Sequence, residues 1–205
     1  KVRKADPTLA HAMRLGNFDD DTAMRILKGQ EALATKAVPS PTKDEVYEAS
    51  SKALGNMLAD DPDSRASLVQ AGRAYYAHEQ LRGNHITLDE AMKKAGNIVE
   101  VSRGHLLWKN KYSTVAPAPG MDGNSFDKFT DDRLSNLDAW TKYSTGIPAR
   151  TEDNLPMKVS TLKGSDLEYH YRDDGKYDIM YEGKRVLTEN GTPSVIDLRK
   201  LYQDK

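Results

Sequence analysis

The sequence predicts an α+β fold in which an N-terminal antiparallel helical array is followed by a small antiparallel β-meander. The first observation is a series of segments between residues 21 and 102 whose apolar residues recur at helical spacing behind capping residues. The second is the alternation of aromatic and β-branched residues with polar ones over 166–198, where turns that contain glycine separate the runs. We therefore expect a helical region over 1–112, a linker loop over 113–123, and a helix plus sheet over 124–205.

Capping signals divide the N-terminal region into helices. Thr42 with Glu45, and Thr87 with Glu90, have the spacing of a capping box, in which the two side chains bond each other's backbone N–H groups. Asp63 or Ser64 is the expected cap of the helix between these two boxes. A short helix is expected after Pro7, and longer helices are expected over about 21–37, 42–59, 64–82 and 88–102.

The pattern changes after residue 104. Prolines 117 and 119 stiffen a loop, and Ser125 is the expected cap of a helix that runs to about Tyr143. The segment Met157–Leu162 is predicted to be a strand, and residues 145–156 to be irregular. These elements lead into the sheet.

The meander is the clearest structural signal in the chain. Its turns are Asp174-Gly175, Glu182-Gly183 and Asn190-Gly191, since glycine supplies the positive φ that tight hairpins need. A short helix is expected after it, around Leu198 and Leu201. Exposed edges of such a sheet tend to pair with other strands, so the free edges are the expected place for a partner to dock.

Composition and motifs exclude several kinds of site. The chain has no cysteine, its net charge is −1, and no apolar run approaches the ~18 residues of a membrane helix. No phosphate-binding glycine loop is present and the five histidines are scattered. We expect no cofactor, no metal site, no sequence-specific nucleic-acid binding and no transmembrane segment. The chain begins at Lys1 rather than Met, so we expect a processed product or a fragment of a longer protein.

Two groups of residues suggest chemistry, and each has a structural interpretation that we favour. His78-Glu79 lacks the second histidine of a zinc-peptidase helix, because position 82 is Arg. Glu79 is nevertheless a candidate acid for a peptidoglycan-degrading enzyme, the alternative function. The sheet tyrosines, among them Tyr169 and Tyr171, fit core packing, with stacking on a cell-wall glycan as the alternative. The acidic residues between them disfavour nucleic acid.

Two parts of the sequence resemble the C-terminal region of large bacteriophage virion proteins, which are internal (ejected) or tail-associated and linked to transglycosylases. The first part is Leu107-Trp108-Lys109-Asn110, the run APAPGMDGNSF at 116–126, and Asp132-Arg133-Leu134. The second is the series of turns at Gly175, Gly183 and Gly191, which ends in Val195-Ile196-Asp197-Leu198. The resemblance covers about residues 64–202.

The resemblance implies a role and a location, and it transfers no catalytic residue. We expect a non-catalytic structural domain of a virion protein, located in the virion and delivered with it to the host cell envelope. It would serve particle assembly or genome ejection by contacting other virion proteins or copies of itself, with peptidoglycan as an alternative partner. Aromatic residues dominate interface energies, so the expected contacts are Trp108, Tyr112 and Trp140, followed by Tyr169 and Tyr171.

Overall fold

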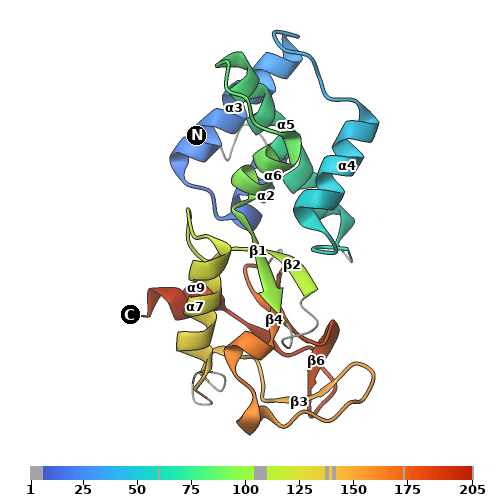
Figure 1. Ribbon diagram of the computed structural model, residues 1–205, viewed down its shortest axis with the longest axis vertical. Coiled ribbons are helices and arrows are strands. Elements are labelled where there is room, and N and C mark those ends of the chain that lie inside the picture. The colour runs from blue at the N-terminus through green and yellow to red at the C-terminus, as the bar shows by residue number, and fades with distance from the viewer. Residues whose placement is uncertain are drawn as a thin grey trace. The chain divides into compact units, whose positions relative to one another are not determined.

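The computed structural model divides the chain into two compact units, Lys1–Val99 and Glu100–Lys205 (Figure 1). It describes residues 7–59, 61–103, 110–136, 139, 142–172 and 174–204. The predicted α+β class is confirmed, with the helices gathered in the N-terminal part and most of the strands in the C-terminal part. The division falls between Val99 and Glu100, ahead of the linker that the sequence predicts at 113–123.

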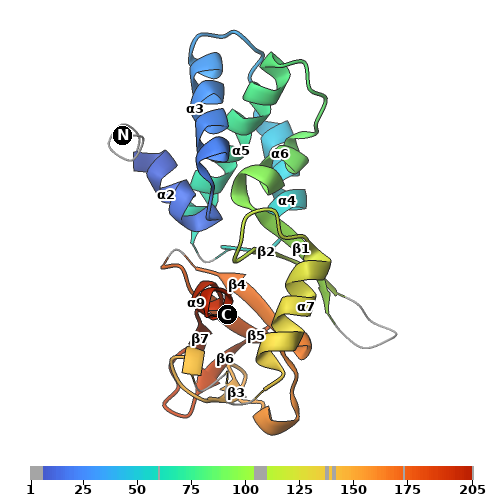
Figure 2. The same ribbon diagram turned by 90° about the vertical axis from the view of Figure 1, so that its left-hand side faces the viewer.

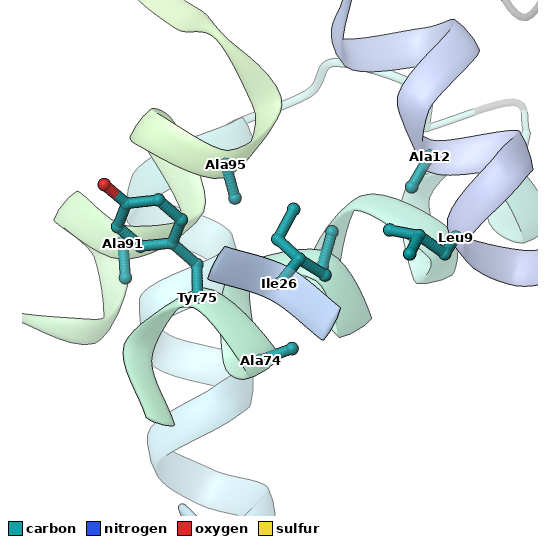
Figure 3. Packing of buried hydrophobic residues seen from close by; sticks show 8 residues of the cluster. Leu9, Ala12, Ile26, Ala74, Tyr75, Ala91 and Ala95 are labelled. Atoms are coloured by element: carbon teal, nitrogen blue, oxygen red, sulfur yellow. The ribbon is translucent and has the colours of Figure 1, made fainter. Parts of the chain in front are cut away.

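The first unit is built around one long helix, α5 (Pro62–Leu81). Both α3 (Asp20–Ala34) and α6 (Leu88–Gly96) pack along it, and α2 (Pro7–Gly16) crosses it. Small residues let these helices approach closely, and larger ones such as Ile26 and Tyr75 fill the centre (Figure 3). The remaining helix, α4 (Lys43–Leu54), lies mainly against α6.

Both predicted capping boxes are confirmed. Glu45 Oε2 accepts from the Thr42 N–H at 2.7 Å, and Thr42 Oγ1 accepts from the Glu45 N–H at 3.3 Å. Thr87 and Glu90 form the same pair of bonds at 2.9 and 3.3 Å. These bonds satisfy N–H groups that the first helical turn leaves without an intrahelical acceptor.

The N-cap of α5 differs from the one that the sequence predicts. Asp61, rather than Asp63 or Ser64, is the N-cap: its Oδ1 accepts from the Ser64 N–H at 3.0 Å. Pro62 then occupies the first turn, where its missing N–H costs nothing.

The predicted helix over 88–102 is too long. It ends at Gly96 because Asn97 adopts the left-handed conformation, with φ of 50°, and its N–H bonds back to Lys93 and Lys94. The chain continues as β1 (Ile98–Arg103), which pairs with β2 (Asn110–Val115). Ile98 and Val99 satisfy a helical stripe and a strand equally well, so their periodicity did not separate the two.

The second unit contains the predicted meander, and its sheet has the strand order β3-β6-β5-β4 (Figure 2). The strands are β3 (Pro148–Thr151), β4 (Glu168–Tyr171), β5 (Tyr177–Tyr181), β6 (Lys184–Thr188) and β7 (Val195–Ile196). All the pairs are antiparallel, and β7 joins β5 beside β6. The short terminal helix is confirmed as α9 (Leu198–Gln203).

Other boundaries in this unit differ from the prediction. Helix α7 (Gly123–Leu134) ends well before Tyr143, and Asp122 rather than Ser125 caps it. Met157–Leu162 is no strand and contains a 3₁₀ turn, Val159–Thr161, whereas β3 lies in the segment predicted to be irregular. The predicted linker begins inside β2.

Alternation along β4 and β5 separates the two faces of the sheet. Tyr169 lies opposite Ile179 and Tyr171 opposite Tyr177, and all four are buried. The rings of Tyr171 and Tyr177 meet edge to face at 5.1 Å. Phe126 of α7 packs against Tyr169, so α7 contributes to the core on this face.

Candidate functional site

The aromatic residues expected at an interface have different positions. Tyr169 and Tyr171 are 2% and 1% exposed, so their rings form the core and offer no surface to a partner or a glycan. Tyr112 is half-buried in β2. Trp108 and Trp140 lie outside the described residues. Of these five aromatic residues, Tyr112 is therefore the one that is both described by the structure and partly exposed. Its surroundings are the ones relevant to a binding site.

Tyr112 lies beside a polar cluster on the outer face of β4. Its ring centroid is 6.2 Å from that of His170, whose Nε2 is 3.8 Å from Glu168 Oε2. Burial, with the Glu168 carboxylate next to it, raises the pKa of the Tyr112 phenol. Burial lowers the pKa of His170, and Arg185 adds to that effect while Asp178 opposes it.

This cluster stabilises the hairpin. Glu168 Oε1 accepts from the N–H of Gly183, in the two-residue turn that joins β5 to β6. Both turn residues, Glu182 and Gly183, have positive φ, as a type I′ turn requires. Asp178 pairs with arginines on both sides, Arg172 at 3.2 Å and Arg185 at 3.7 Å. These groups hold the strands together.

The edges of the sheet are partly covered by the chain itself. Along β4, the Thr114 hydroxyl of β2 donates to the Tyr169 carbonyl at 2.5 Å. Along β3, the chain turns back so that Met157 N–H bonds to the Ala149 carbonyl at 3.0 Å and Thr151 N–H to the Leu155 carbonyl at 2.9 Å. These contacts reduce the backbone that an added strand could pair with, contrary to the expectation of free edges.

Glu79, the candidate acid of a hydrolase, has a structural role. It is 5% exposed, and its carboxylate accepts from Arg25 Nη1 at 3.3 Å and from Asn84 Nδ2 at 2.6 Å. Arg25 also contacts Asp21 at 2.7 Å and the Tyr75 hydroxyl at 3.4 Å. Glu79 thus ties α3 and the loop after α5 to the end of α5.

A groove of about 630 Å³ runs between α3 and the C-terminal half of α5, and we call it the α3/α5 groove. Met24 and Leu81 line it and are 49% and 53% exposed. Lys28 and Arg82 line it as well, and among the described residues neither forms an ion pair. Burial lowers the pKa of the neighbouring His78, the Glu79 carboxylate opposes that effect, and the charges of Arg82 and Lys28 add to it. Asp21 and Glu31 line it too, so the groove combines apolar walls with charges of both signs.

A second groove in the same unit, of about 380 Å³, lies between the starts of α4 and α6. It is lined by Pro39, Ser40, Pro41, Glu45, Glu48, Ala49, Lys52, Tyr76, Thr87, Leu88 and Asp89. Glu45 belongs to the capping box, and Glu48 pairs with Lys52 at 2.8 Å. Neither carboxylate has the buried setting that tunes a catalytic acid.

Comparisons with known proteins add no relative: no family model, curated protein or solved structure matches this chain. No helix in the described part of the chain is both long and apolar enough to cross a membrane. Over the same residues, no three His, Asp or Glu side chains gather closely enough to hold a metal ion.

Sequence reasoning missed the α3/α5 groove. Met24 and Lys28 come from one helix and Leu81 and Arg82 from the end of another, more than fifty positions away. The sequence offered one indication of this groove. Met24 and Leu81 are large apolar residues at helix positions that do not face the core. Both side chains are exposed, although residues of this type usually face the core.

Proposed function

We propose that this chain is a non-catalytic assembly domain of a bacteriophage virion protein, acting in particle assembly or in genome ejection through the host envelope. One observation carries the non-catalytic part. The deeply buried acid of the helical unit, Glu79, is held by Arg25 and Asn84, whereas the open groove nearby presents Met24 and Leu81. Apolar side chains in an open groove suit binding another protein.

The virion assignment rests on the sequence resemblance, and the local geometry of its motifs supports it. Gly120, Gly175, Gly183 and Gly191, which anchor the resembling segments, have φ between 73° and 83°. Other residues are strained in that conformation, so these glycines are needed for the turns. The resembling pattern is thus tied to the shape of the chain in this region.

Location in the particle tests the virion role. Antibodies raised against the purified chain are used on phage particles banded in a density gradient from the source culture. We expect the chain to co-sediment with capsid and tail proteins and to cross-link to them. A chain that is found only in the soluble lysate, free of particles, overturns the assignment.

A turbidity assay on purified peptidoglycan tests the absence of catalysis. We expect no clearing by the chain under conditions in which a lysozyme control clears the suspension. Clearing that disappears in Glu79→Gln, with the fold intact by circular dichroism, would instead identify a cell-wall hydrolase. Sedimentation of the chain with insoluble peptidoglycan checks the glycan-binding alternative in the same experiment.

A further inference from the structure

We draw no further inference here: the strongest candidate, the α3/α5 groove with its exposed Met24 and Leu81, is lined by charges of both signs, and nothing in the structure shows what covers it.

Discussion

Gly29 of α3 lies directly against the backbone carbonyl of Ala74 in α5. A Cβ atom built on Gly29 would be 1.7 Å from that oxygen and 3.1 Å from the His78 nitrogen. The two helices approach this closely because glycine has no side chain. The glycine that weakens α3 as an isolated helix thus permits the α3–α5 contact, and with it the two walls of the α3/α5 groove.

Gly29→Ala is predicted to destabilise the helical unit. Alanine is the better helix former by about 1 kcal/mol, so propensity alone predicts a gain in the free energy of unfolding. The added methyl must instead displace backbone, and overpacking of this kind typically costs about 1–3 kcal/mol. Because the clash is with backbone, we expect a cost of about 2–3 kcal/mol, which leaves a net loss of about 1–2 kcal/mol after the gain in helix propensity. Urea unfolding followed by circular dichroism at a helical wavelength measures this loss.

Lys94→Ala on α6 is the matched control for this prediction, because Lys94 is exposed and the change also introduces alanine into a helix. Its free energy of unfolding should stay within about 0.5 kcal/mol of the wild type. A Gly29→Ala protein as stable as this control would show that α3 and α5 do not approach closely in solution.

Glu79 is predicted to contribute to stability rather than to catalysis. Glu79→Gln keeps an acceptor for Asn84 but removes the charge that faces Arg25, so we expect a loss of about 1–3 kcal/mol. Glu79→Ala removes both interactions and should cost more, about 3–5 kcal/mol. Urea unfolding of the two variants at pH 7 measures both losses of stability and shows which is larger. Equal stability of Glu79→Gln and the wild type would contradict the role that we assign to the carboxylate.

His170 is predicted to make the second unit sensitive to mild acid. Burial lowers its pKa in the fold below the ordinary value of 6.5, so the unfolded chain binds a proton more readily than the folded one. Its contribution is therefore complete above about pH 6.5 and is lost as the pH falls from there through the lower folded pKa. The ring-proton chemical shift of His170 in an NMR titration should report a midpoint below 6.5.

The control for this titration is His170→Asn, which removes the titrating group. Carboxylates with lowered pKa also lose stability in acid, so the informative quantity is the difference between the two proteins. We expect the fall in melting temperature between about pH 6.5 and 5 to be shallower in His170→Asn. Parallel pH profiles would mean that His170 titrates freely in the fold.

The sequence predicts local features, such as helix caps and tight turns, better than it predicts tertiary packing. Thr42 and Thr87 could be identified as caps because every atom in a capping box comes from four neighbouring residues. The turn at Glu182-Gly183 could be identified for the same reason. The end of α6 could not, since Ile98 and Val99 suit either a helix or a strand until Asn97 is known to adopt positive φ.

The candidate site was less predictable than the fold. Alternation places Tyr169 and Tyr171 on one face of a strand but does not say whether that face is covered by α7 or meets solvent. The groove depends on how Leu81 of α5 lies relative to Met24 of α3, and that relation is set by the close packing at Gly29. A sequence shows the glycine as a defect in a helix and gives no sign of the surface it contacts.

Tyr177 is predicted to hold β2 to the sheet through its hydroxyl. The side chain is fully buried, and its hydroxyl donates to the Val115 carbonyl at 2.5 Å, where β2 ends. Burial raises the pKa of Tyr177, so the hydroxyl is a protonated donor at neutral pH. Tyr177→Phe leaves that carbonyl without this donor in a region that water does not reach, and we expect a loss of about 1–3 kcal/mol.

Tyr143→Phe is the matched control, because it removes the same atom from an exposed bond. The Tyr143 hydroxyl donates to Asp204 at 2.6 Å at the surface, where water can replace it. Its loss should change the free energy of unfolding by less than about 0.5 kcal/mol. Urea unfolding followed by near-UV circular dichroism measures both variants. If the two changes cost the same, β2 is held to the sheet by the Thr114 contact and by apolar packing, and the Tyr177 hydroxyl is not what fixes it.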